Sequence, residues 1–445
     1  MSILKNTPSK AKSGVLPTRG VTGTHERMKI LPLAPIDYYY EQNTQAGAYS
    51  DEPDAAFNNQ LKNGGEPFGE EVSREFSNSD SRRGLVKART VYEYRDRYKF
   101  SRLVVDDCLI FDSHFESGNL LSAKRIYNEE KPDRLYQEYD LKLHHDVHCK
   151  NGLSQWFYFS ASSNCSFPSQ NVKIKFNIIN FSKPDSLYNY GMKPLHCSSN
   201  DGSWKRIGDK IRYFPTKLQD CQQNREGKKY YTLSFVFYMN RSDDVHYFAA
   251  AFPYTYNHLQ QYLYKLELDR ARAVYLHREL LCETVSGNRC DLLTITEPSS
   301  YEYKVRTMRE KRVVVITARV HPGETNASWI CQGIIDFITG MSLEAQDLRS
   351  RYVFKIIPML NPDGVVNGNY RTSMSGVDLN RCWDAPNALS HPTIYRAKKM
   401  INKLKNNRKV ELVCDIHGHS RKEGTPFYVV YLVVPWQVAN KRSCL

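Results

Sequence analysis

The pattern of hydrophobic and polar residues divides the chain into three stretches. Residues 1–95 are rich in Ser, Asn, Gly, Pro and charged residues and show little periodicity, which is typical of a disordered arm. From Leu103 onward, seven short alternating runs follow one another, separated by turns and without a helical pattern between them. Because alternation marks a strand with one buried face, residues 96–254 are predicted to form an antiparallel β-sandwich.

The hydrophobic period lengthens after Pro253. From residue 254 to residue 280, apolar spacing at Leu259, Leu263 and Leu266 predicts a helix or two. Apolar runs that read as strands then alternate with helical patterns, at 311–320, 352–361, 410–416 and 427–434. Strands that alternate with helices indicate a mostly parallel α/β sheet, so residues 255–445 are predicted to form a second domain.

Length and charge fit this division and add a constraint on partners. A chain of 445 residues exceeds the usual size of one domain, so two domains and a tail are expected. The formal net charge of +14 favours an acidic partner, which by charge alone is nucleic acid, an anionic membrane or an acidic protein segment. Charge alone also fits a basic surface that serves only solubility.

Cysteine usage indicates the compartment. The eleven Cys residues are odd in number, form no CxxC pair, and include Cys331 and Cys414 inside apolar patterns. This pattern suits a reducing compartment, where a buried thiol acts as a small hydrophobic group. The N-terminus lacks an apolar run of signal-peptide length, and no stretch is long and apolar enough to span a membrane. We therefore expect a cytoplasmic protein that does not span a membrane.

Potential metal ligands follow two of the predicted strands. His321 and Glu324 come just after the strand at 311–320, and His417 follows the strand at 410–416. Since neighbouring parallel strands bring their carboxyl ends together, these three side chains are expected to converge and to leave one zinc coordination position open. His419 is an alternative ligand that ranks second because it lies further into the loop.

Two arginines lie in loops after the second predicted strand of this domain. A metallohydrolase that cleaves peptides needs a cation where the oxyanion develops, and an exopeptidase needs an Arg that holds the terminal carboxylate. Arg371 and Arg381 lie in loops where they are able to meet these needs. Either residue alone would more often be an ordinary surface arginine.

Several linked motifs resemble one known family. The order and spacing found in zinc metallocarboxypeptidases recur in the motifs HPGET, NPDGV followed by GNYR, DLNR and DIHGHSRK. The residues within these motifs are similar to those of the cytosolic carboxypeptidase subfamily. The stretches QWFYF and YTLSFVFY resemble the β-sandwich that precedes the catalytic domain in that subfamily. The resemblance covers about residues 104–430 and implies an α/β carboxypeptidase domain with a mixed sheet.

The resemblance also implies roles for individual residues. His321, Glu324 and His417 correspond to the ligands of one Zn²⁺ per chain, and Arg371 corresponds to the Arg that polarises the scissile carbonyl. Asn380 and Arg381 correspond to the pair that grips the substrate's terminal carboxylate. Members of the subfamily remove glutamates from polyglutamylated tubulin and related acidic tails, which implies microtubule-associated partners.

One part of the family pattern is missing from this sequence. The family's general-base Glu lies on a later strand, whereas this chain ends 28 residues after His417 (445 minus 417). The acid in that tail, Glu423, matches no catalytic position of the family. We therefore expect a carboxypeptidase domain that is incomplete at its C-terminus and lacks the general base.

Two function classes remain open from the sequence. The first is a zinc carboxypeptidase that acts on glutamates, and the second is a catalytically silent truncated form that binds acidic tails or microtubule-associated partners. Release of glutamate from a polyglutamylated peptide distinguishes them. A nucleic-acid binder rests on charge and aromatic residues alone and is the weakest of the alternatives.

Overall fold

The computed structural model describes residues 87–96, 108–127, 136–150, 152–163, 172–216, 227, 229–239, 244–298, 310–419 and 427–430. All of these residues belong to one compact unit. The predicted disordered arm lies outside the described residues, except for its last part. Within the described residues, no helix is long and apolar enough to cross a membrane.

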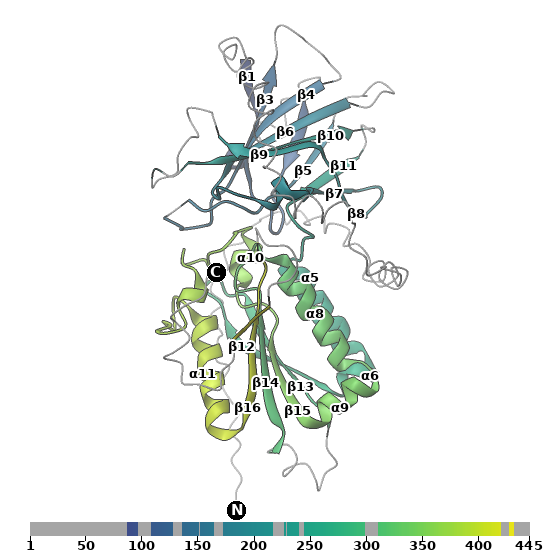
Figure 1. The fold of residues 1–445 in the computed structure, drawn as a ribbon, viewed down its shortest axis with the longest axis vertical. Coiled ribbons are helices and arrows are strands. Elements are labelled where there is room, and N and C mark those ends of the chain that lie inside the picture. Colours follow the sequence, from purple (N-terminus) through teal and green to yellow (C-terminus); the bar gives the residue numbers. More distant parts are fainter. Residues whose placement is uncertain are drawn as a thin grey trace, which may run out of the picture. The chain divides into compact units, whose positions relative to one another are not determined.

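Eleven strands of the described part form a β-sandwich of two sheets (Figure 1). The first sheet has the order β1-β3-β4-β6-β10-β9, and the second has the order β2-β5-β11-β7-β8. The strands are β1 (Lys87–Glu93), β2 (Leu109–Asp112), β3 (Leu120–Tyr127), β4 (Tyr136–Leu143), β5 (Tyr158–Ser163), β6 (Val172–Phe181), β7 (Leu195–Ser198), β8 (Trp204–Arg206), β9 (Asp209–Pro215), β10 (Tyr231–Met239) and β11 (Val245–Ala249).

Aromatic side chains from both sheets fill the core of the sandwich. Phe176 of β6 is fully buried, and its ring centroid lies 5.6 Å from that of Phe235 and 5.1 Å from that of Phe248. Phe159 of β5 lies 5.7 Å from Phe176 in an edge-to-face arrangement. Such contacts between facing sheets bury large apolar areas, so the alternation seen in the sequence translates into one packed layer.

Two details of the sandwich differ from the sequence prediction. The pair β4 and β6 is parallel, since β5 between them in the chain belongs to the other sheet, so the sandwich is not purely antiparallel. Strand β1 (Lys87–Glu93) pairs with β3, although these residues were assigned to the polar arm. This edge strand is rich in polar residues and buries Tyr92, so its apolar signal is too weak to stand out.

The remaining described residues form an α/β domain around a mixed sheet, which confirms the predicted class. The strand order is β12-β13-β15-β14-β16-β17, and β14 is parallel to both β15 and β16. The other pairs are antiparallel. The strands are β12 (Leu276–Glu283), β13 (Arg289–Ile295), β14 (Arg312–Ala318), β15 (Tyr352–Ile357), β16 (Val410–Ile416) and β17 (Phe427–Val430).

Helices cover both faces of this sheet (Figure 1). On one face, Val314 and Ile316 of β14 pack in a core with α5 (Tyr256–Leu268) and α8 (Thr325–Thr339). On the other face, Val313 and Val315 pack in a core with α11 (Pro392–Asn407). Burial on both sides explains why β14 is a continuous β-branched run rather than an alternating one. The remaining helices are α6 (Arg270–Ala273), α9 (Leu343–Arg351), α10 (Pro362–Val366) and the 3-10 helices η2 (Tyr94–Asp96), η3 (Leu187–Tyr190) and η5 (Leu379–Arg381).

One predicted helix is partly wrong. The segment from residue 254 to residue 280 was assigned to one or two helices, and α5 and α6 account for its first part. Its last residues belong to β12, which begins at Leu276 and pairs with β13. The strand carries charged residues between its apolar ones, so its short pattern fits a period of two as well as a period of 3.6.

Candidate metal centre

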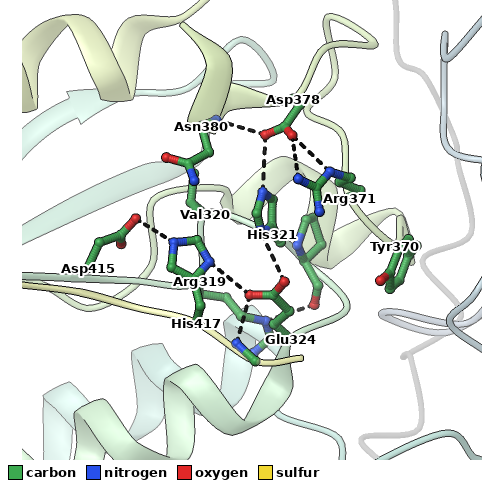
Figure 2. Close-up of polar contacts among 12 residues, drawn as sticks. Arg319, Val320, His321, Glu324, Tyr370, Arg371, Asp378, Asn380, Asp415 and His417 are labelled. Carbon is green, nitrogen blue, oxygen red and sulfur yellow. Dashed lines mark hydrogen bonds and ion pairs between the residues drawn. The ribbon is translucent and has the colours of Figure 1, made fainter. Parts of the chain in front are cut away.

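The parallel strands β14 and β16 deliver His321 and His417 to the same edge of the sheet (Figure 2). Strand β14 ends at Ala318 and the chain turns through His321 to Glu324, while β16 ends at Ile416 immediately before His417. Glu324 directly precedes α8, whose N-terminal dipole stabilises a negative charge at this position. The position beyond the carboxyl ends of parallel strands is where open α/β sheets bind ligands.

His321, Glu324 and His417 meet as the sequence predicted. The Nδ1 atom of His321 lies 2.9 Å from Glu324 Oε1, and the Nδ1 atom of His417 lies 3.1 Å from Glu324 Oε2. One potential ligand atom from each of the three residues lies within 4.8 Å of the others. The alternative ligand His419 is not a member of this group, so the structure favours His417.

Each histidine also contacts a second carboxylate through its other nitrogen. His321 Nε2 lies 3.1 Å from Asp378 Oδ1, and His417 Nε2 lies 2.8 Å from Asp415 Oδ2. Carboxylates that hold one imidazole nitrogen orient the ring and fix which nitrogen is free to ligate a metal. In both rings Nε2 contacts the second carboxylate, Asp378 or Asp415, and Nδ1 faces Glu324. The Nδ1 atoms are therefore the ones placed to ligate a metal.

These two supporting carboxylates were not predicted from the sequence. Asp378 was noted as part of the DLNR motif without a role, and Asp415 was taken as an ordinary strand residue. For Asp415 a signal exists in the sequence, because residues two positions apart in a strand point to the same face, as Asp415 and His417 do. For Asp378 no local signal exists, since 57 residues separate it from His321.

The electrostatics of the centre favour positive charge. Burial lowers the pKa of His417, but its hydrogen bonds to Asp415 and Glu324 outweigh this effect and raise the pKa to about 10. Burial alone would raise the pKa of Glu324, yet the hydrogen bonds from both histidines bring it well below its ordinary value. A buried group of carboxylates that retains its negative charge suits a cation.

Asp378 connects His321 to Arg371 (Figure 2). The Nε atom of Arg371 donates to Asp378 Oδ2 over 2.8 Å, and a second guanidinium nitrogen lies 2.8 Å from the same oxygen. Burial raises the pKa of Asp378, but the hydrogen bond to His321 and the charge of Arg371 lower it to about 2. Asp378 therefore stays ionised at neutral pH, and its negative charge holds Arg371 beside the proposed metal ligands.

The two residues predicted to grip a carboxylate lie in and around η5. Asp378 caps this short helix and accepts a hydrogen bond of 2.9 Å from the backbone N–H of Asn380. The Asn380 side-chain oxygen accepts a hydrogen bond of 3.1 Å from Trp383 Nε1. Arg381 is exposed, and its guanidinium contacts the Asn380 carbonyl over 3.4 Å. The structure thus places Asn380 next to the centre, whereas the contact it shows for Arg381 is with Asn380.

The turn that carries His321 and Glu324 depends on a buried arginine. Arg319 is 2% exposed, adopts a left-handed backbone conformation at φ 57°, and donates to the carbonyls of Pro322 and Tyr254 over 2.8 and 3.1 Å. Burial lowers its pKa to about 9. These hydrogen bonds fix the turn from within, and nothing in the sequence pattern marked Arg319 for this role.

The turn also packs tightly against the chain that leads to Arg371. The N–H of Gly323 donates to the Tyr370 carbonyl over 2.8 Å. A Cβ atom at Gly323 would lie 2.7 Å from Tyr370 Cδ2 and 2.9 Å from the Tyr370 carbonyl oxygen. Only glycine allows this approach, which brings the turn at 321–324 and the segment with Arg371 together.

The donor set fits zinc. Two imidazole nitrogens and one carboxylate are the ligands of many catalytic zinc sites, and each imidazole here has a carboxylate that orients it. These three side chains, His321, Glu324 and His417, are therefore the residues that would hold the ion. Glu423 lies outside the described residues.

Replacing Asp415 with asparagine is expected to weaken zinc binding by about 10-fold to 100-fold, because the imidazole of His417 loses its charged hydrogen-bond partner. Competition with a chromophoric chelator measures the affinity. Asp347→Asn is the matched control, since Asp347 pairs with Arg351 on the exposed surface of α9. An unchanged affinity in Asp415→Asn would show that the contact does not support the metal.

Comparison with known proteins relates this domain to zinc carboxypeptidases. Residues 259–422 match the family described as zinc carboxypeptidase. The fold is similar to that of a metallo-carboxypeptidase from Burkholderia cenocepacia, with a TM-score of 0.51, 23% identity and coverage of 71% of this chain and 72% of that chain.

The more specific similarity is to cytosolic carboxypeptidases. The chain is 44% identical over 352 residues to cytosolic carboxypeptidase 1 of Xenopus laevis, which covers 76% of this chain and 28% of that protein. It is 40% identical over 333 residues to cytosolic carboxypeptidase 3 of Mus musculus, which covers 73% of this chain and 31% of that protein. The chain thus spans less than a third of the length of these relatives.

Proposed function

We propose that this chain is a zinc-dependent carboxypeptidase that removes C-terminal or side-chain glutamates from polyglutamylated proteins such as tubulin. The observation that carries the proposal is the cluster of His321, Glu324 and His417, which Asp378 connects to Arg371. This arrangement combines a metal-binding group with a fixed cation beside it. The similarity to cytosolic carboxypeptidases supports a carboxypeptidase activity.

Each residue of the centre has a defined task in this proposal. Zinc, when bound by His321, Glu324 and His417, supplies a Lewis acid that polarises the scissile carbonyl. The guanidinium of Arg371 stabilises the negative charge that develops on the carbonyl oxygen, because Asp378 holds it in place before the substrate arrives. Asn380 and Arg381 bind the terminal carboxylate of the substrate, which restricts cleavage to a chain end.

A proton acceptor for the attacking water is a separate requirement. The carboxylates that contact the two histidines are Glu324, Asp378 and Asp415, and each is already engaged with an imidazole. In the proposed mechanism these groups orient the ligands and do not take the proton. General-base catalysis by a separate group typically contributes about 10² to 10⁴ in rate.

The preference for an acidic partner is supported by the charge of the chain. Residues 385–410 contain seven Lys or Arg residues and no Asp or Glu. Most of these cations lie on α11, where Arg396, Lys399, Lys403 and Lys405 are exposed. A row of cations on one helix attracts a polyglutamate tail over distances of about 8–10 Å at physiological ionic strength. We infer a location in the cytosol, near microtubules, from this preference and from the names of the relatives.

The proposal predicts that the full chain, loaded with one equivalent of zinc, releases free glutamate from a peptide that ends in a glutamate chain. Mass spectrometry of the shortened peptide and amino-acid analysis measure the release. A peptide that ends in glutamine at the same positions is the matched substrate, and we expect slower release from it because its side chains lack charge.

Two controls test whether the release depends on zinc. A chelator and the substitution Glu324→Ala are each expected to stop the release, since both remove zinc from the centre. Absence of release from the zinc-loaded wild-type chain contradicts the proposed activity. If the same chain still binds the glutamate peptide, the alternative of a silent form that binds acidic tails is favoured.

A further inference from the structure

The segment that carries Arg371 is held by loops of the β-sandwich. The N–H and hydroxyl of Ser117 donate to the carbonyls of Val366 and Val365 over 3.0 and 2.7 Å. The N–H of Val147 donates to Asn369 Oδ1 over 3.1 Å. Residues 365–372 are therefore fixed by contacts with residues more than 200 positions away in the sequence.

The packing of this segment leaves little room for movement. Gly376 has a φ of +73°, and a Cβ atom there would lie 2.3 Å from the carbonyl oxygen of His148. Gly368 has a φ of +68°, and its Cβ atom would lie 2.8 Å from the carbonyl oxygen of Ser117. At both positions the backbone of the segment touches the backbone of a sandwich loop, which only glycine permits.

Asp146 makes the most concentrated of these contacts. Asp146 lies in the loop after β4 and is 5% exposed. Its Oδ1 accepts a hydrogen bond of 2.6 Å from the N–H of Tyr370. Its Oδ2 accepts hydrogen bonds of 2.8 Å from the N–H groups of Arg371 and Thr372, and one of 3.1 Å from the Thr372 hydroxyl.

The loop that presents Asp146 is itself fixed. The N–H of Asp146 donates to the Leu153 carbonyl over 2.9 Å, and its carbonyl accepts from the N–H of Cys149 over 3.1 Å. These backbone hydrogen bonds fix the loop at the residue that carries the carboxylate. Hydrogen bonds between a charged acceptor and N–H groups are also among the stronger ones in proteins.

We propose that Asp146 is a positioning residue for Arg371, through which the β-sandwich takes part in the metallopeptidase centre. Three consecutive N–H groups bound to one carboxylate fix the peptide planes on both sides of Arg371. Those planes set the direction in which the Arg371 side chain leaves the backbone, toward Asp378 (Figure 2). The inference rests on the proposed function in so far as that function assigns Arg371 to the oxyanion.

A purely structural role for Asp146 makes a different prediction. If Asp146 only stabilised the fold, its replacement would lower stability without a selective effect on the interactions of Arg371. If it positions Arg371, its loss acts through that residue. Replacing Arg371 in addition then causes no further loss, because two substitutions on one path are not additive.

The substitution Asp146→Asn tests the proposal in the zinc-loaded full chain. It preserves the size of the side chain but turns one acceptor into an N–H₂ donor that faces other donors. Asp244→Asn is the matched control, because Asp244 is another carboxylate of the sandwich, 4% exposed, that contacts Ser198 and Ser199 and not the Arg371 segment. Zinc content is measured for each variant.

Two readouts apply to these variants. Hydrogen–deuterium exchange of peptides that cover residues 369–377 reports on the segment without any need for catalysis. The affinity for a glutamyl phosphinate, whose tetrahedral oxygens resemble the developing oxyanion, reports on Arg371. Asp146→Asn is expected to speed exchange of residues 370–372 and to weaken phosphinate binding about 10-fold, since small displacements of a positioned group have large effects. Zinc content should remain at the wild-type value, and Asp244→Asn should change neither readout.

Several results would overturn the proposal. Unchanged exchange in Asp146→Asn would show that the carboxylate does not hold the segment. Faster exchange with unchanged phosphinate affinity would show that the contact is structural only. A double variant with Arg371→Ala whose loss equals the product of the two single losses would show that Asp146 does not act through Arg371.

The test remains decisive when a variant or the proposed function fails. If Asp146→Asn does not fold, Thr372→Val removes one of the four hydrogen bonds and should show the same changes to a smaller extent. Unchanged exchange in Thr372→Val then counts against the proposal. If the zinc-loaded wild-type chain does not bind the phosphinate, the proposed function is contradicted, while the exchange data still decide whether Asp146 holds the segment.

Discussion

Replacing His417 with alanine is expected to abolish stoichiometric zinc binding. His417 supplies one of three ligand groups, and its Nδ1 atom lies beside the Glu324 carboxylate that would share the ion. With two ligands left, the site no longer has the three protein donors of a catalytic zinc site. Metal analysis of the chain after gel filtration measures the change, from about one zinc per chain to well below one.

His419→Ala is the matched control for this prediction. It lies two residues further along the same loop, and the sequence alone ranked it as the second choice for a ligand. The group of potential ligands contains His417 and not His419, so the control should retain its zinc. Loss of zinc in His419→Ala with retention in His417→Ala would reverse the assignment of the ligand.

The convergence of the three potential ligands was predictable because it depends on local patterns. A β-branched run such as Arg312–Ala318 identifies a strand buried on both faces, and a polar residue just beyond it identifies the strand end. Parallel pairing of β14 with β16 then makes the convergence of His321 and His417 a consequence of topology. The resemblance of the motifs to a known family added a proposed role for Arg371, which spacing alone left open.

The supporting contacts were not predictable, since they join residues far apart in the chain. Asp378 meets His321 across 57 residues, and Asp146 meets Tyr370 across 224 residues. No periodicity encodes such contacts, because they depend on how loops pack, within the α/β domain for Asp378 and between the two domains for Asp146. Asp415 is the exception, since its spacing of two from His417 was visible in the strand pattern.

The errors in the fold also have local causes. Strand β1 was hidden in a polar stretch because an edge strand buries few side chains, here Tyr92. The first part of β12, residues 276–280, was assigned to a helix because this strand lies at the edge of the sheet in the α/β domain, where charged and apolar residues mix. Central strands such as β14 are the ones whose composition leaves no such ambiguity.

Replacing Arg371 with alanine is expected to lower kcat/KM for glutamate release by about 10²-fold to 10³-fold, the usual cost of losing one oxyanion donor. The guanidinium is held by Asp378 at 2.8 Å, so it meets the developing charge without reorganising. Zinc content should not change, because His321, Glu324 and His417 all remain. Steady-state kinetics on the glutamate peptide, together with metal analysis, measure both quantities.

The division of the loss between kcat and KM tests which role Arg371 has. A group that acts only on the transition state affects kcat, whereas a group that binds the terminal carboxylate equally in both states affects KM. We therefore expect a fall in kcat for Arg371→Ala and a rise in KM for Arg381→Ala. Arg351→Ala, on the exposed surface of α9, is the control that should leave both constants unchanged. A change confined to KM in Arg371→Ala would mean that this residue binds the carboxylate and that the oxyanion has another partner.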